Sequence, residues 1–165
     1  MRATHTRRCA LVGGLLLMVG SSPVQAAENM QFRGTLLTPA PCTLNGGQRI
    51  DVDFGASLGV NTVDGINYRQ TVDYQLVCEP GASGKTLGLT LTGPAAAYDT
   101  ATLQTSQAGL GIRLTLGGQP FRLATRVLIE ASAPPVLQAV PVKAPDATLT
   151  EGAFEVLATL LADYQ

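Results

Sequence analysis

Apolar and polar side chains alternate in several short segments of this chain. Residues 50–54 read Ile-Asp-Val-Asp-Phe, with the apolar side chains at the even positions and the carboxylates at the odd ones. Residues 72–78, 87–92 and 110–116 alternate in the same way. A period of two is typical of β-strands that bury one face and expose the other. We therefore predict a β-strand in each of these four segments.

Turn-forming residues stand where the alternation stops, for example at residues 45–47 (Asn-Gly-Gly) and 117–118 (Gly-Gly). Prolines are frequent between residues 133 and 145, which would confine any strand there to a sheet edge or to short pieces. Outside residues 1–26, no amphipathic helix is indicated. Many short strands separated by turns predict an all-β fold, a single antiparallel β-sandwich.

The N-terminal residues have the layout of a cleavable secretory signal. Arginines precede an apolar run at residues 10–20, and a small-residue cleavage site ends at Ala26. The run is shorter than the roughly 20 residues that a membrane-spanning helix needs. A twin-arginine signal is the weaker alternative, because the residues after Arg7-Arg8 fit it poorly. We expect export by general secretion and a mature chain that starts near Ala27.

Loss of this signal changes the chemistry that the chain offers. The only histidine, His5, lies in the signal, and the rest of the chain has eight basic and twelve acidic side chains, a net charge of −4. Mild acidity argues against nucleic acid or an anionic membrane surface as a partner. Two cysteines, Cys42 and Cys78, remain in a chain sent to an oxidising compartment, so we expect a disulfide. Two lone thiols without histidine would make a poor zinc site.

Side chains suited to catalysis or metal binding are sparse in the mature chain. Without histidine, neither a Ser-His nor a Cys-His pair can form. Asp51 and Asp53 would project from one face of a strand and could bind calcium or transfer protons. Outward-facing carboxylates of this kind are far more often simply solvated. We predict no catalytic site, no metal site and no cofactor.

The segment near the mature N-terminus has a strand pattern of its own. Met30, Phe32, Gly34 and Leu36 share one side of an extended strand that leads towards Cys42. A segment at the mature N-terminus, just before the first disulfide cysteine, is an unusual place for a strand of the core. Periodicity alone leaves open that this segment is the ordinary first strand of the sandwich.

The C-terminal segment, residues 152–165, predicts a further strand. Leu157 and Leu161 interrupt its alternation, so we expect its second face to be partly covered as well. The positions that alternate along its main face are Gly152, Phe154, Val156, Ala158, Leu160, Ala162 and Tyr164.

These features together resemble the chaperone-usher pilins. Gly152, the alternation after it and the penultimate Tyr164 are similar to the C-terminal signature of that family. The segment 32–36, with Cys42 beyond it, resembles the family's N-terminal extension and first cysteine. The resemblance covers the mature chain, residues 27–165.

The resemblance implies an incomplete immunoglobulin-like β-sandwich of six strands. Its missing strand would leave a hydrophobic groove beside the C-terminal strand, and such an open apolar edge is prone to aggregate. A periplasmic pilus chaperone would fill the groove first. At the outer-membrane usher, the N-terminal extension of a neighbouring pilin subunit would replace the chaperone by β-augmentation. The implied donor residues are Met30, Phe32, Gly34, Leu36, Thr38 and Ala40, and the strand bordering the groove is the one that carries Gly152, Phe154, Val156, Ala158, Leu160, Ala162 and Tyr164.

The implied domain organisation is a signal peptide at residues 1–26, a donor-strand extension at 27–41 and a pilin domain at 42–165. The implied product is a non-enzymatic structural subunit of a cell-surface fimbrium, reached through the periplasm, that supports adhesion. Only residues 27–31 precede Phe32, so the extension is more similar to those of minor tip or adaptor pilins than to those of major rod pilins. A major rod pilin and a self-contained secreted immunoglobulin-like binding module stay open as alternatives.

Overall fold

A computed structural model of the chain describes residues 30–36, 42–79 and 86–164. The chain divides into two units, residues 1–36 and residues 37–165, and each is described by itself. Residues 30–36 of the first unit carry no helix or strand. The predicted signal peptide lies outside the described residues, so its cleavage stays a prediction.

Over its described residues, the second unit consists of β-strands and one short 3₁₀ helix, η1. Among the described residues there is no α-helix, and no helix is long and apolar enough to cross a membrane. The elements in chain order are β1 (Cys42–Leu44), η1 (Asn45–Gly47), β2 (Gln70–Val72), β3 (Leu76–Cys78), β4 (Leu87–Thr92), β5 (Ala95–Ala96), β6 (Asp99–Gln104), β7 (Leu110–Leu116), β8 (Gln119–Pro120), β9 (Arg126–Ile129), β10 (Leu137–Lys143) and β11 (Thr159–Tyr164).

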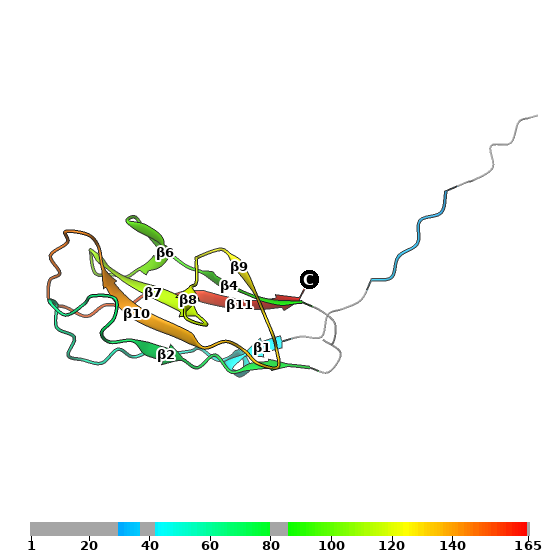
Figure 1. Ribbon diagram of the computed structural model, residues 1–165, viewed down its shortest axis with the longest axis horizontal. Helices are drawn as coiled ribbons and strands as arrows, with labels where there is room; N and C mark the ends of the chain where they lie inside the picture. The colour runs from blue at the N-terminus through cyan, green and yellow to red at the C-terminus, as the bar shows by residue number, and fades with distance from the viewer. Residues whose placement is uncertain (1–29, 37–41, 80–85, 165) are drawn as a thin grey trace, which may run out of the picture. The chain divides into compact units, whose positions relative to one another are not determined.

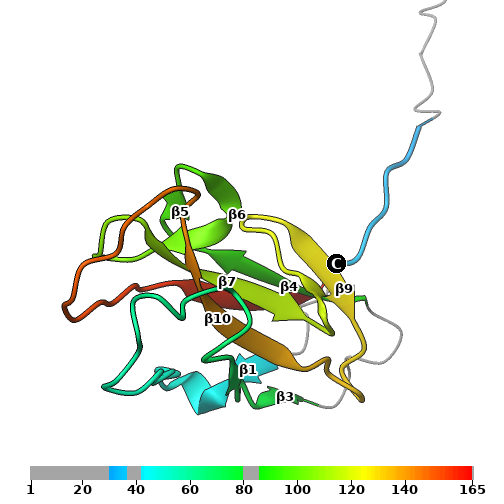
Figure 2. The same cartoon turned by 60° about the vertical axis from the view of Figure 1, so that its left-hand side comes forward.

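All strand pairs are antiparallel, and they form two larger sheets and one separate pair (Figure 1). The first sheet has the order β2-β10-β7-β6-β5, with β8 paired to β7. The second has the order β11-β4-β9, and β1 pairs with β3. Figure 2 shows the β1–β3 pair lying together at one side of the two larger sheets.

Side chains from both larger sheets meet in one hydrophobic core. Leu89 and Leu91 of β4 belong to the same buried cluster as Ile112 of β7 and Leu137 of β10. Burial of apolar surface between two sheets, each with one apolar face, is the main favourable term in such a fold. The predicted antiparallel β-sandwich is therefore confirmed.

Alternation located two of the four predicted strands correctly, and it failed at residues 72–78. The predicted strands at residues 87–92 and 110–116 are β4 and β7. The prediction of one strand over residues 72–78 is wrong, because β2 ends at Val72 and β3 begins at Leu76. Between them Gln75 has a φ of 34°, which is incompatible with strand backbone.

The proline-rich region contradicts its prediction as well. β10 occupies residues 137–143 and lies between β2 and β7 in the first sheet, although it contains the buried Pro141. β2 pairs only with residues 137–139, so at Pro141 the described strands flank β10 on one side alone. A residue without an N–H is tolerated at such a locally exposed strand edge.

The predicted disulfide is confirmed. Cys42 of β1 and Cys78 of β3 are bonded and stand opposite each other in the antiparallel register. The bond closes a loop with a sequence separation of 36 residues. On the chain-entropy estimate, such a loop closure stabilises the folded state by about 3–4 kcal/mol.

Candidate functional site

A groove of about 1680 Å³ opens onto the core between two segments of the second unit. One rim runs from Cys42 to Phe54, and the other runs from Phe154 to Ala162. The lining between the rims includes leucine, isoleucine and alanine side chains of the buried core: Leu91 from β4, Leu103 from β6, Leu110, Ile112 and Leu114 from β7, and Leu137 and Ala139 from β10.

The first rim has the alternation that the sequence predicts without being a strand. Along residues 50–54, the apolar side chains are half-buried and the two carboxylates, Asp51 and Asp53, are exposed. The prediction of a strand here is wrong, because no described strand pairs with this segment. A β-ladder needs a neighbour whose backbone completes its hydrogen bonds, and on its groove side this segment has none in the described chain.

The second rim contains a shorter strand than predicted. The strand begins at Thr159 and not at Gly152. The residues before it bond elsewhere: the N–H of Ser106 donates to the carbonyl of Glu155 (2.9 Å), and the N–H of Glu155 donates to the Ser106 hydroxyl (3.1 Å). These bonds tie the segment to the turn after β6 and keep it out of the β4 ladder.

The predicted face of this rim is only half-covered. Leu157 and Leu161, on the other face, are 72% and 54% exposed, so the expected partial cover of that face is wrong. Gly152 and Ala158 are exposed as well. The half-buried members of the predicted face are Phe154, Val156, Leu160, Ala162 and Tyr164.

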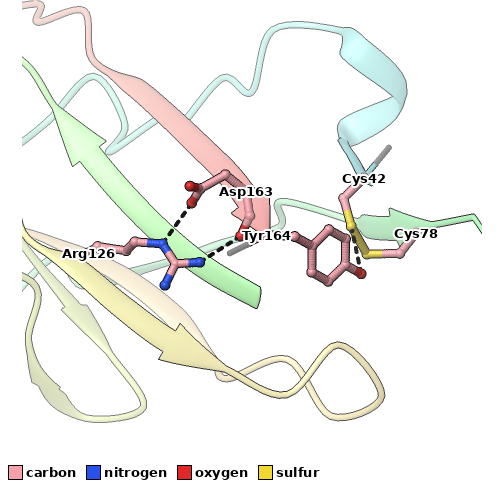
Figure 3. Close-up of a disulfide and its surroundings, with 5 residues drawn as sticks. All are labelled: Cys42, Cys78, Arg126, Asp163 and Tyr164. Carbon is pink, nitrogen blue, oxygen red and sulfur yellow. Dashed lines mark hydrogen bonds and ion pairs between the residues drawn. A yellow bond between two sulfur atoms is a disulfide. The ribbon is translucent and has the colours of Figure 1, made fainter. Parts of the chain in front are cut away.

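Aromatic side chains link the two rims at both ends of the groove. At one end, the Tyr164 hydroxyl donates to the disulfide sulfur Sγ of Cys42 at 3.2 Å (Figure 3). At the other end, the rings of Phe54 and Phe154 lie with their centroids 6.1 Å apart. The chain therefore runs in opposite directions along the two rims. Neither contact is marked by a local sequence pattern, because each joins residues roughly a hundred positions apart.

β11 has one unpaired edge in the described part of the chain. It pairs residue for residue with β4, from Thr159 opposite Thr92 to Tyr164 opposite Leu87, and with no other described strand. An edge strand presents a row of free N–H and C=O groups. The groove therefore offers both features that an extended segment needs for binding, an apolar floor and a backbone ladder.

The carboxylates beside the groove do not gather into a cluster among the described residues. No group of three or more histidine, cysteine, aspartate or glutamate side chains comes together in the described chain. Asp53 instead accepts a hydrogen bond from the N–H of Gly55 at 2.7 Å, an ordinary local turn contact.

The predicted donor residues lie in the first unit or outside the described chain. Met30, Phe32 and Leu36 are 71%, 85% and 101% exposed. A Cβ added at Gly34 would meet no atom within 4 Å. Thr38 and Ala40 lie outside the described residues. The donor role of this set stays a prediction.

A profile described as "Fimbrial protein" matches residues 30–165 of the chain. The fimbrial-like protein YfcQ of Escherichia coli (strain K12) is 39% identical over 156 residues, which span 91% of this chain and 96% of the relative. The match thus extends over both units.

Solved structures of pilus subunits have the same fold. The P pilus adaptor subunit PapF is 25% identical with a TM-score of 0.57, and the comparison covers 78% of this chain and 98% of that one. The P pilus rod subunit PapA is 23% identical with a TM-score of 0.60, covering 76% and 100%. A chain from a chaperone-usher pilus with an uncoiling rod is 22% identical with a TM-score of 0.57, covering 88% and 100%. The expected immunoglobulin-like pilin fold is therefore confirmed.

Proposed function

The chain belongs to the fimbrial protein family, and on that premise we propose that it polymerises by donor-strand exchange. It is a structural subunit of a chaperone-usher fimbria and not an enzyme. In the proposed assembly, the groove of one subunit is filled by the N-terminal extension of the next.

The open groove beside the unpaired edge of β11 carries this proposal. Its rims hold half-buried apolar side chains, and its floor is the core itself. Each square ångström of apolar surface removed from water contributes roughly 25 cal/mol. A strand laid between the rims would cover this surface and pair with β11 at the same time.

The proposed donor is residues 27–41, with Met30, Phe32, Gly34, Leu36, Thr38 and Ala40 facing the groove. Phe32 and Leu36 are the anchors, because the other four side chains are flexible, small or absent. Each large apolar side chain would contribute about 1.5–3 kcal/mol on full burial, before the cost of ordering the extension. Gly34 would lie where the groove is shallow.

The proposal includes the order of partners. After export by the signal at residues 1–26, a periplasmic chaperone pairs with the C-terminal strand and covers the groove. At the outer-membrane usher, the extension of a neighbouring subunit replaces it. An exposed apolar edge favours aggregation, which gives a physical reason for the groove to be covered at every stage.

We further propose a minor position in the fibre, at the tip or as an adaptor. After cleavage at Ala26, only residues 27–31 would precede Phe32. The similarity to an adaptor subunit agrees with this position. The comparable similarity to a rod subunit makes the major rod position the alternative to test.

The experiment compares two forms of the mature chain, residues 27–165, produced without a chaperone. One form is unmodified, and the other has residues 27–41 appended after Gln165 through a short flexible linker. We expect the first to aggregate and the second to be a stable monomer, as judged by size-exclusion chromatography and thermal unfolding. A well-folded monomeric unmodified chain would identify a self-contained binding module and contradict donor-strand exchange.

A further inference from the structure

The side chain of Arg126 in β9 extends across β4 to Asp163, near the C-terminal end of β11. Its Nε donates to Oδ1 of Asp163 at 3.0 Å, and its Nη2 donates to the Asp163 carbonyl at 2.9 Å (Figure 3). The same Nη2 donates to the carbonyl of Thr86 at 3.1 Å. One guanidinium therefore bonds to the side chain and the backbone of β11 and to the backbone just before β4.

A glycine makes room for this reach. Gly88 of β4 stands between Leu128 of β9 and Asp163 of β11 in the register of the sheet. A Cβ added to Gly88 would lie 2.4 Å from Cζ of Arg126. The Arg126 side chain thus occupies the space that the Cβ of any other residue at position 88 would take.

Opposite faces of β11 are held by different contacts near its end. Asp163 bonds to Arg126 on the outer face, whereas the neighbouring Tyr164 donates to the disulfide sulfur of Cys42 on the groove side (Figure 3). Ends of edge strands open locally more easily than strands with two neighbours. These contacts restrain the part of β11 whose free edge adjoins the groove.

We propose that Arg126 is a positioning residue, which keeps the end of β11 in register with β4 as a preformed edge for the incoming strand. This inference rests on the proposed function and names the residue that prepares its binding edge. A strand already held in the extended form loses less conformational freedom on pairing, and preorganisation of this kind raises the rate and the affinity of binding.

The test uses the mature chain, residues 27–165, refolded by dilution from denaturant with a fluorescent peptide of residues 27–41. Two variants remove the contact in different ways: Arg126→Met deletes the guanidinium, and Gly88→Ala displaces it. Arg113→Met is the matched control, because it deletes a similar pair, Arg113 to Asp99 at 3.1 Å, in the other sheet.

We expect both Arg126→Met and Gly88→Ala to capture the peptide roughly three- to tenfold more slowly than the wild type. The partly exposed ion pair to Asp163 alone is worth up to about fivefold, and two hydrogen bonds to carbonyls are lost with it. In the form with residues 27–41 appended after Gln165, amide hydrogen exchange at residues 159–164 should accelerate in the same two variants. Arg113→Met should stay within about twofold of the wild type in both measurements.

Equal capture rates and equal exchange in Arg126→Met and the wild type would overturn the inference, and so would an equal slowing in all three variants, which indicates a general loss of stability. Failure of the wild type to capture any peptide would contradict the proposed function instead. In that case the exchange at residues 159–164 still decides whether Arg126 holds the strand.

Discussion

β10 and β11 are strands of similar length, and both carry apolar side chains. They differ in how many strands pair with them. Leu137, Ala139 and Val142 of β10 are buried at 2–4% exposure, because β7 lies along the whole strand and β2 along part of it. Leu160 and Ala162 of β11 are only half-buried, and among the described strands β11 pairs with β4 alone. How deeply an apolar side chain is buried thus depends on how many strands flank its own strand. In the described chain, β11 still has one unpaired edge.

The largest expected effect is at the covered strand. Leu137→Ala removes a side chain that packs among residues of both sheets, and we expect it to lower the free energy of unfolding by about 2–5 kcal/mol. Denaturant unfolding of the mature chain with residues 27–41 appended measures this change. A loss below about 1 kcal/mol would mean that β10 is no better packed than β11.

At the open strand, Leu160→Ala and Leu161→Ala separate the groove face of β11 from its outer face. In the form with residues 27–41 appended, Leu160 becomes covered by the donor, and we expect its loss to cost about 2 kcal/mol or more. Leu161 is 54% exposed on the other face, so its loss should cost about 1 kcal/mol or less. Urea unfolding of both variants against the donor-appended parent gives the two values. Equal losses would show that no strand covers Leu160.

The smallest expected effect concerns the ion pair of the first sheet and its pH dependence. The N–H of Ala101 and the hydroxyl of Thr102 donate to the Asp99 carboxylate, and with Arg113 they lower its pKa below the ordinary value of 3.8. A carboxyl with a lowered folded-state pKa stabilises the fold above its unfolded pKa, and this stability is lost as the pH falls through the folded pKa.

Asp99→Asn should therefore lower the free energy of unfolding by about 1 kcal/mol or less at pH 7, since solvent screens the partly exposed pair. The difference between the wild type and Asp99→Asn should be constant from about pH 5 to 7 and shrink below about pH 4. Chemical denaturation at several pH values measures it. A difference that grows on acidification has the wrong sign and would exclude this role of Asp99.

Much of the sandwich could be predicted from local patterns. The alternation at residues 87–92 and 110–116 located β4 and β7, and two cysteines in an exported chain were enough to predict the Cys42–Cys78 bond. These features depend on side-chain periodicity and on redox chemistry, which a sequence displays directly.

The candidate site could be predicted only from the resemblance to the chaperone-usher pilins. Its individual contacts could not be predicted. Alternation at residues 50–54 placed the apolar side chains inward but could not show that the segment has no pairing partner. Nothing in the sequence marks Gly88 as the place where Arg126 crosses to Asp163. The expectation that prolines confine a strand to a sheet edge failed for β10. Only the register shows that β2 pairs with residues 137–139 and that no described strand flanks Pro141 on that side.

Local sequence is enough to tell which side chains can face a core, where the chain turns and which cysteines can bond. Which strands become neighbours emerges only in the folded molecule, and with it the edge of β11 that no described strand pairs with, above an open apolar floor. The physical reason is that alternation is a property of single segments, whereas pairing joins segments far apart in the chain. The number of neighbours that a strand acquires is therefore settled by the whole fold.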